Sequence, residues 1–257
     1  MLLAIDIGNT TIACGLFRGR RLARRLNMPT ALAVRPAALA RRLKATLAGA
    51  RIEQAIICSV VPPATRALPN ILRRLGIQPV VVVGQDIRVP LVNRYRYPKQ
   101  VGQDRLVGAY AAWCEFGKGR GTGGGGKDCI VADFGTAITI DVVTKAGAYL
   151  GGIIAPGLDI SLEALATRTA LLPKVELKEP PELLGRDTAN SIRSGILYGC
   201  VALCEGLVGQ LKRQYAPKAV VVATGGASPL IAKHSRIVDH LKPHLVLEGL
   251  HLLSYKY

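Results

Sequence analysis

Two stretches of this sequence share one design, and their repetition constrains the fold more than any other feature. LLAIDIGNTTIACGLF (residues 2–17) and IVADFGTAITIDVV (residues 130–143) each run from an apolar strand that ends in Asp-x-Gly, through a turn of small residues, into a second strand. QAIICSVVPPATRAL (residues 54–68) and KAVVVATGGASPLI (residues 218–231) each lead from an apolar strand through Gly or Pro into a helical pattern. Repetition at about half the chain length predicts two similar domains that arose by duplication.

Helical patterns separate these strands and define the class. Apolar residues recur at helical spacing in residues 35–49, and a longer helix is expected from Asp187, as its N-cap, to about Tyr215. Gly195, Gly199 and two later glycines would weaken that helix, and close packing against another element would explain why they are tolerated. The prediction is an α/β fold with an N-terminal domain at 1–116, a C-terminal domain at 128–257 and a Gly-rich linker at 117–127.

Composition describes a folded, basic protein. No stretch reaches the roughly 18 uninterrupted apolar residues of a membrane span. Asp6 interrupts the apolar start and no basic segment precedes it, so we expect no signal peptide, no membrane association and a cytoplasmic location. The net charge of +17 indicates anionic ligands. We favour a solvated basic face over a nucleic-acid role, because the basic run RGRRLARR (residues 18–25) carries no aromatic residues for base stacking.

The six cysteines form no C-x-x-C pair. Cys200 and Cys204 would share a helix face, which allows a metal or a disulfide in principle. Reduced core thiols are the favoured interpretation, because cysteine packs as a small hydrophobic residue.

The Gly-rich run resembles a phosphate-binding loop but fails as one. GTGGGGKD (residues 121–128) fits G-x-x-x-x-G-K, yet Asp128 stands where a P-loop needs Ser or Thr for magnesium. The run also follows a helical pattern and precedes a strand, which reverses the order that a P-loop requires. We interpret it as a linker.

The two Asp-x-Gly turns are better candidates for phosphate binding. Glycine lets the backbone approach a ligand closely, and Asn9, Thr10 and Thr11 offer hydrogen-bonding groups to phosphate oxygens. Asp6 among phosphates makes sense through magnesium, which prefers carboxylate and phosphate oxygens. A single turn of this kind could be an ordinary hairpin. Two copies at the same place in a repeat favour a nucleotide in a cleft between the domains.

VGQDRLVGAYAAW (residues 101–113) holds the other candidate pair. Asp104 and Arg105 follow a glycine at the start of an apolar helical run. They could be an N-cap and a surface cation, or Asp104 could accept a proton from a substrate hydroxyl while Arg105 binds an anionic group.

Together these residues resemble the type III pantothenate kinases, of the acetate kinase, sugar kinase and actin superfamily. The resemblance runs end to end, and any one of its motifs alone is weak. The matching stretches are DIGNTT (6–11), SVVPP (59–63), VGQDR (101–105), DFGTAITID (133–141), YLGGIIAPGLDIS (149–161), LPKVEL (172–177), GRDTANSIRSGILYG (185–199) and ATGG (223–226).

The resemblance implies ATP-dependent phosphorylation of pantothenate to 4'-phosphopantothenate, the first step of coenzyme A biosynthesis. It also implies two ribonuclease-H-like domains, a homodimer with active sites at the subunit interface, magnesium, and a monovalent cation that is potassium or ammonium.

The resemblance assigns roles position by position. Asp104 matches the general base. Asp6 matches a residue near magnesium, and Asp133 matches the monovalent-cation ligand. ATP contacts would come from Gly8, Asn9, Thr10, Thr11, Thr136, Gly225 and Gly226, the two last with an adenosine-side turn. Pantothenate contacts would come from Tyr95, Gly102, Gln103, Asp104, Arg105 and Thr188.

The sequence also departs from the family pattern. In YRYPKQVGQDR (residues 95–105) Tyr95 is kept, whereas Arg96, Tyr97, Gln100 and Gln103 differ from the common family residues, which affects the substrate pocket but not the base. Two alternatives stay open: a kinase of another small hydroxy acid or polyol on this scaffold, and a non-catalytic regulatory or nucleic-acid-binding relative. The intact Asp6, Asp104 and Asp133 argue against the second.

Overall fold

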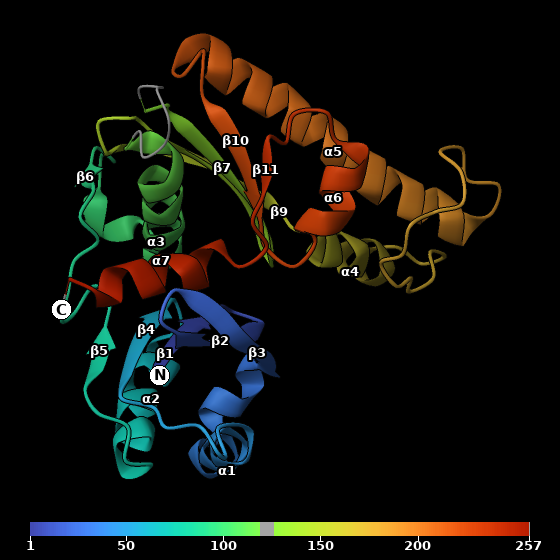
Figure 1. Ribbon diagram of the computed structural model, residues 1–257. Helices are drawn as coiled ribbons and strands as arrows, with labels where there is room; N and C mark the ends of the chain where they lie inside the picture. The colour runs from blue at the N-terminus through green and yellow to red at the C-terminus, as the bar shows by residue number, and fades with distance from the viewer. Residues whose placement is uncertain (119–125, 257) are drawn as a thin grey trace. The chain divides into compact units, whose positions relative to one another are not determined.

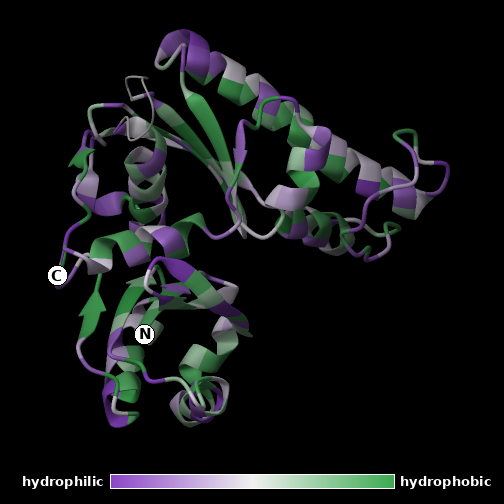
Figure 2. Ribbon diagram, in the orientation of Figure 1, coloured by the Kyte–Doolittle hydropathy of each residue, from purple (hydrophilic) through white to green (hydrophobic). Residues whose placement is uncertain are grey.

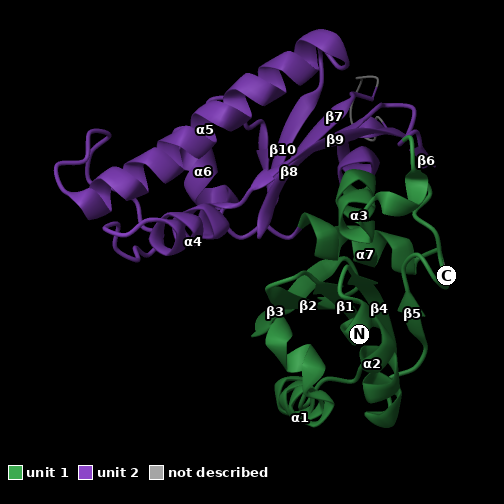
Figure 3. Cartoon of the chain, turned by 180° about the vertical axis from the view of Figure 1, so that it is seen from behind, with its two compact units in different colours: residues 1–91, 96–111, 245–257 green, residues 92–95, 112–244 purple. Residues whose placement is uncertain are grey.

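The computed structural model describes residues 1–118 and 126–256, which form two compact units. Unit 1 comprises Met1–Leu91, Arg96–Ala111 and Leu245–Tyr257, and unit 2 comprises Val92–Tyr95 and Ala112–His244 (Figure 3). The predicted domains, 1–116 and 128–257, follow the sequence repeat and stay a prediction, as does the cleft between them. Most of the Gly-rich run, at 119–125, lies outside the described residues.

Unit 1 is built on a mixed five-stranded sheet in the order β3-β2-β1-β4-β5 (Figure 1). β1 (Leu2–Ile7), β2 (Thr11–Arg18) and β3 (Arg21–Pro29) form an antiparallel meander. β4 (Gln54–Ser59) lies parallel to β1, and β5 (Val80–Val82) lies parallel to β4.

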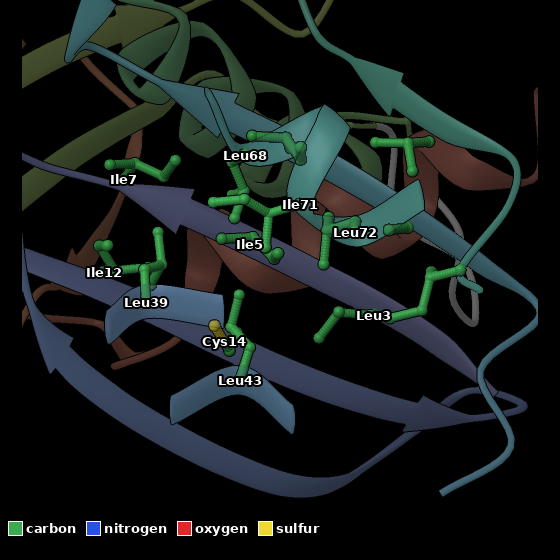
Figure 4. Close-up of a cluster of buried hydrophobic side chains, with 14 of the residues drawn as sticks. Leu3, Ile5, Ile7, Ile12, Cys14, Leu39, Leu43, Leu68, Ile71 and Leu72 are labelled. Atoms are coloured by element: carbon green, nitrogen blue, oxygen red, sulfur yellow. The ribbon is translucent and has the colours of Figure 1, made fainter. Parts of the chain in front are cut away.

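The core of unit 1 lies between this sheet and two helices, α1 (Pro36–Thr46) and α2 (Pro62–Arg74). Alternate residues of β1 point the same way, so Leu3, Ile5 and Ile7 all reach this core (Figure 4). A short 3-10 turn, η1 (Thr30–Val34), precedes α1. The strand and helix predicted at 54–68, and the helix predicted at 35–49, are confirmed.

Two further helices belong to unit 1. α7 (Leu245–Ser254) packs on β1, β2 and β4, and α3 (Gln103–Ala112) follows the 3-10 turn η2 (Pro98–Gln100). Gly249 lets α7 approach α3 closely, because a Cβ there would collide with the Val107 carbonyl.

Unit 2 repeats the same topology in a six-stranded sheet of order β11-β10-β7-β8-β9-β6. Its strands are β7 (Cys129–Phe134), β8 (Ala137–Val143), β9 (Ala148–Pro156), β10 (Val220–Thr224), β11 (His240–Leu241) and β6 (Val92–Asn93). β7, β8 and β9 form the antiparallel meander, while β10 lies parallel to β7 and β11 lies parallel to β10. Apart from the edge strand β6, which has no counterpart, the strand order matches unit 1, so the predicted duplication is confirmed.

Three helices complete unit 2: α4 (Leu158–Arg168), α5 (Thr188–Gln214) and α6 (Ser228–His234). A one-turn π-helix, Trp113–Gly117, continues α3 into this unit. The strands of the sheet are apolar, and α5 alternates apolar and polar patches (Figure 2). Its buried residues Leu197, Val201 and Cys204 pack on the sheet.

Asp187 is the predicted N-cap of α5. Its carboxylate accepts a hydrogen bond from the Asn190 backbone N–H at 2.8 Å. The packing predicted for the glycines of α5 is wrong within the chain, because a Cβ at Gly195, Gly199 or Gly206 would meet no atom within 4 Å.

All six cysteines are free thiols, as predicted. Cys14, Cys58, Cys129 and Cys204 are buried, while Cys114 and Cys200 are partly buried. Asp128, the residue that breaks the P-loop pattern, accepts a hydrogen bond from the Lys145 backbone N–H at 2.7 Å. Its carboxylate therefore anchors the turn after β8.

Candidate active site

The first Asp-x-Gly turn connects β1 to β2 and is fixed by backbone hydrogen bonds. The Gly8 N–H donates to the Thr11 carbonyl at 3.0 Å. Thr30, the first residue of η1, also holds the turn: its hydroxyl donates to the Gly8 carbonyl at 2.7 Å and its N–H donates to the Thr10 carbonyl at 2.9 Å. Asn9, Thr10 and Thr11 are exposed at this turn. The sequence did not single out Thr30, because its partners lie some twenty residues away.

Asp6 lies near the end of β1, in the middle of the sheet. It pairs with Ala13 of β2 on one side and with Cys58 of β4 on the other. Its Oδ1 atom is buried. Burial, with a smaller contribution from Asp6, raises the pKa of Cys14 to about 12. The negative charge of Asp6 therefore raises the pKa of a thiol on the neighbouring strand β2.

Asp104 lies in the first turn of α3, where a helix N-terminus favours a carboxylate. Its Oδ1 accepts a hydrogen bond from the Arg105 backbone N–H at 2.8 Å. A Cβ at Gly102 would collide with the same carboxylate oxygen, so glycine here leaves the Asp104 side chain in this position. Gln103, the next residue, packs its side chain against Gly84, whose φ is +87°.

Cys58 is influenced by both candidate acids of unit 1, Asp6 and Asp104. Its pKa is raised well above the ordinary value, first by complete burial and then by the charges of Asp6 and Asp104. The two acids are almost a hundred residues apart in the sequence, yet the charge of each raises the pKa of the same buried thiol. The sequence predicted both as site residues, but not that one buried thiol would lie near both.

The second Asp-x-Gly turn connects β7 to β8 in the same way. The Gly135 N–H donates to the Ala137 carbonyl at 3.2 Å, so this turn is one residue shorter than the first. Asp133 precedes it on β7, between Thr139 of β8 and Thr224 of β10. Thr136 lies at the turn and is partly buried.

Two glycines from distant segments close around this second turn. A Cβ at Gly225, whose φ is +90°, would collide with the Asp133 carboxylate and the Phe134 backbone. A Cβ at Gly157, just before α4, would collide with the carbonyls of Thr136 and Gly135. Gly225 was a predicted site residue. Gly157 was not, although it lies in the stretch YLGGIIAPGLDIS that carries the resemblance.

The remaining predicted residues lie at several places. Tyr95 borders a cavity of about 450 Å³ in unit 2, where its ring packs against Gly151. Thr188 is the exposed first residue of α5, and Arg105 lies on α3. A Cβ at Gly226 would meet no atom within 4 Å.

Asp6 and Asp133 are the predicted cation ligands, and these roles stay a prediction. Each is a carboxylate at an Asp-x-Gly turn, where magnesium or potassium would find oxygen ligands. In the part of the chain that the structure describes, no three His, Cys, Asp or Glu side chains gather into a metal cluster. A cation at either turn would therefore combine one carboxylate with oxygens of the nucleotide, which is how magnesium is commonly bound in kinases.

α5 is long and apolar enough to cross a membrane by length and composition alone. Its most apolar 18-residue window has a mean hydropathy of 1.3 and is 28% buried. One helix of this kind is weak evidence for a membrane span, since a helix that packs on a protein core passes the same test.

The architecture defines the class of protein. Two mixed sheets with the same strand order, each with an Asp-x-Gly turn at the end of its central strand, make an α/β protein of two ribonuclease-H-like units. EutJ, an ethanolamine utilization protein from Carboxydothermus hydrogenoformans, has this fold, with a TM-score of 0.56, 17% identity and coverage of 97% of this chain and 88% of that one. A Campylobacter jejuni protein described as a Baf family transcriptional activator also has it, with a TM-score of 0.56, 16% identity and coverage of 99% and 97%.

Sequence comparison identifies the family. The model of the type III pantothenate kinases matches residues 2–210. The type III pantothenate kinase of Syntrophotalea carbinolica is 38% identical over 98% of both chains. That of Listeria innocua is 39% identical over 98% of this chain and 96% of its own. This chain belongs to the type III pantothenate kinase family.

Proposed function

We infer that this protein phosphorylates pantothenate with ATP and forms 4'-phosphopantothenate, the first step of coenzyme A biosynthesis. The observation that carries this inference is the similarity to type III pantothenate kinases over 98% of the chain. The charges of Asp6 and Asp104 both raise the pKa of Cys58, which supports this inference, because a kinase needs a phosphate-binding turn close to its proton acceptor.

In the proposed reaction the two Asp-x-Gly turns hold the ATP phosphates. Gly8 to Thr11 in the first turn and Thr136 in the second offer backbone and side-chain donors to phosphate oxygens. Gly225 and Gly226 form the adenosine-side turn. The hydrogen bonds from Thr30 and the close packing of Gly157 support this role, because they fix both turns before the nucleotide arrives.

Asp104 is the proposed general base. It accepts the proton of the pantothenate hydroxyl as the bond to phosphorus forms, and it need not ionise the alcohol beforehand. Its hydrogen bond with the Arg105 N–H holds the carboxylate in place. Gly102, Gln103, Arg105, Tyr95 and Thr188 complete the acceptor contacts in this proposal, with Arg105 binding the pantothenate carboxylate.

Asp6 would hold magnesium and Asp133 would hold potassium or ammonium. When bound, these cations neutralise phosphate charge during transfer. The collision that a Cβ at Gly225 would make with Asp133 supports the second assignment, because only glycine leaves space for oxygen ligands beside that carboxylate.

We propose that the active form is a homodimer and that α5 lies at its interface. Gly195, Gly199 and Gly206 leave an open, shallow face on this helix. Leu203 of the same helix, which borders a cavity together with Gly195 and Gly199, is 43% exposed. A second copy would cover this face, as expected of an obligate interface. The six free thiols fit a reducing, cytoplasmic location.

A panel of acceptors tests the proposed function. ATP, magnesium and potassium are incubated with pantothenate, glycerol, glucose or acetate, and the products are identified by mass spectrometry. Conversion of pantothenate alone, with one phosphate added to its primary hydroxyl, is the expected result. If another acceptor is phosphorylated in preference to pantothenate, the protein is a kinase with the same fold but a different substrate. No turnover with any acceptor would favour a non-catalytic relative.

A further inference from the structure

The hairpin of β2 and β3 carries the densest positive charge in unit 1. Five arginines lie within eight residues: Arg18, Arg20, Arg21, Arg24 and Arg25. We call this segment the basic ribbon, and all five side chains are exposed. Residues 7–52 contain no aspartate or glutamate, so no acid close in the sequence balances them. The proposed kinase reaction uses none of these arginines.

The strand register places like charges face to face. Arg18 is the cross-strand partner of Arg21, on either side of the turn at Gly19, whose φ is +55°. Like charges directly opposite each other destabilise a hairpin. Among the described residues, no ion pair connects any arginine of the basic ribbon to a carboxylate. A bound polyanion would relieve this repulsion.

The C-terminal helix holds the tip of the basic ribbon in place. His251 of α7 lies with its Nε2 atom 2.7 Å from the Gly19 carbonyl oxygen. Its ring stacks on Phe17, with centroids 4.3 Å apart and planes 12° from parallel. Tyr255 adds a contact between its hydroxyl and the same Nε2 atom at 3.0 Å. A ribbon fixed in this way loses little conformational entropy when it binds a ligand.

We infer that the basic ribbon binds the sugar-phosphate backbone of double-stranded DNA without regard to sequence. Arginine suits this role, because its planar guanidinium donates two parallel hydrogen bonds to a phosphate. The tip of the hairpin, residues 18–21, extends past the pairing of β1 with β2, which ends at Phe17. A two-stranded tip fits the major groove of B-form DNA, whereas the deep and narrow groove of A-form RNA does not admit it. Composition alone favoured a solvated basic face over a role in binding nucleic acid. The structure adds two observations that favour binding: the arginines that face each other across the hairpin, and the contacts that fix its tip.

Other polyanions fit the basic ribbon less well. Single-stranded nucleic acid needs aromatic side chains for base stacking, but Phe17 is 2% exposed and already stacked on His251. A membrane surface binds best where basic residues accompany exposed apolar ones. Leu22 and Leu26, the leucines of β3, are partly buried.

Fluorescence anisotropy with labelled duplex DNA over a salt series tests the inference on the full chain. The variant R18Q/R20Q/R21Q is compared with the control R66Q/R73Q/R74Q, which removes three exposed arginines from α2 of the same unit. Each phosphate contact contributes about 0.9 to the slope of log K against log salt. The ribbon variant should therefore lower the slope by about 2 to 3, and the control by less than about 1.

Several results would overturn the inference. The inference fails if the unmodified protein does not bind duplex DNA, or if the two variants lower the salt slope equally. It also fails if the protein binds single-stranded DNA more tightly than duplex DNA, or binds phosphatidylserine vesicles but not DNA. Pantothenate turnover, measured on both variants, should stay at the unmodified level, which separates this inference from the proposed function.

His251 provides a second readout. Burial, and then the positive charge of Arg20, lowers its pKa, while the hydrogen bond to Gly19 acts in the opposite direction. DNA phosphates at Arg20 would offset that positive charge, so the imidazole NMR signals should titrate at higher pH when duplex DNA is added. An unchanged His251 titration would place the DNA elsewhere on the molecule and overturn the inference.

Discussion

At the residue scale, Asp104 makes the sharpest prediction. Replacing it with asparagine keeps the size and the acceptor oxygen but removes the group that takes the proton. Asp104→Asn should lower kcat on the order of 10²–10⁴-fold. The affinity for ATP should change little, because the nucleotide is held by the Asp-x-Gly turns. Steady-state kinetics and calorimetric titration with ATP measure the two effects separately.

Two results would contradict the general-base role of Asp104 or its assumed independence from ATP binding. Turnover within a few-fold of the unmodified enzyme would remove the general-base role from this residue. Loss of ATP binding together with turnover would indicate that the substitution disturbs the fold at Cys58 instead.

Gly225 tests how tightly the second turn is packed. Its positive φ and its position against Asp133 leave no room for a Cβ, so Gly225→Ala should lower the free energy of unfolding by about 1–3 kcal/mol. Gly226→Ala is the matched control for stability, because a Cβ there meets no atom within 4 Å. Denaturant unfolding of both variants measures the difference. Equal stabilities would contradict the packing that we describe around Asp133.

The sequence predicted the acidic residues of the site better than the residues that hold the two turns in place. Asp6, Asp104 and Asp133 stand in short motifs whose chemistry can be read locally. Thr30 and Gly157 act through hydrogen bonds and close packing with residues about twenty positions away, and no local pattern encodes such contacts. The nearness of Asp6 and Asp104 to Cys58 likewise depends on how β1, β4 and α3 pack together.

At the element scale, α5 is the helix whose exposed face needs a partner. Gly199 borders a cavity of about 210 Å³ together with Cys200 and Leu203. Gly199→Leu should leave the protomer folded, since open space surrounds the glycine, and should block a second helix from approaching. Sedimentation equilibrium should therefore show the unmodified protein at twice the chain mass of 27.3 kDa and the variant at a single chain mass.

Ala37→Leu is the control for this experiment, because it adds an exposed leucine to α1 in the other unit. It should leave the dimer intact. A monomeric unmodified protein, or a variant that dimerises as well as the control, would contradict an interface on α5.

The N-terminus of α5 should show a pH dependence that comes from Asp187. The hydrogen bond from the Asn190 backbone lowers the pKa of this carboxyl below its usual range. Its stabilising contribution is therefore fully present above the unfolded-state pKa of about 3.9 and is lost as the pH falls through the lower folded-state value. Asp187→Ala should lower the Tm by about 2–4 °C at pH 7.

The same substitution should have little effect at a pH below the folded-state pKa, where the aspartate is protonated in both states. Melting curves at the two pH values measure this difference. A loss of Tm that is equal at both would assign the stabilisation to something other than the charged N-cap.

At the scale of the whole molecule, duplication was predictable because both copies keep the same strand-turn-strand pattern. The division into units was less accessible. The sequence places residues 245–257 after the second repeat, whereas the contacts place α7 with β1, β2 and β4 of unit 1. α7 packs on unit 1 because its surface is apolar and because Gly249 allows a close approach. The periodicity of the sequence does not predict where such a helix will pack.

The central claim is that the two Asp-x-Gly turns and Asp104 together transfer phosphate from ATP to pantothenate, with the help of a monovalent cation. Release of ADP, measured with and without pantothenate and with and without potassium, tests this most directly. We predict rapid release only when pantothenate and potassium are both present. Release that is independent of pantothenate, or none with both present, would contradict the account.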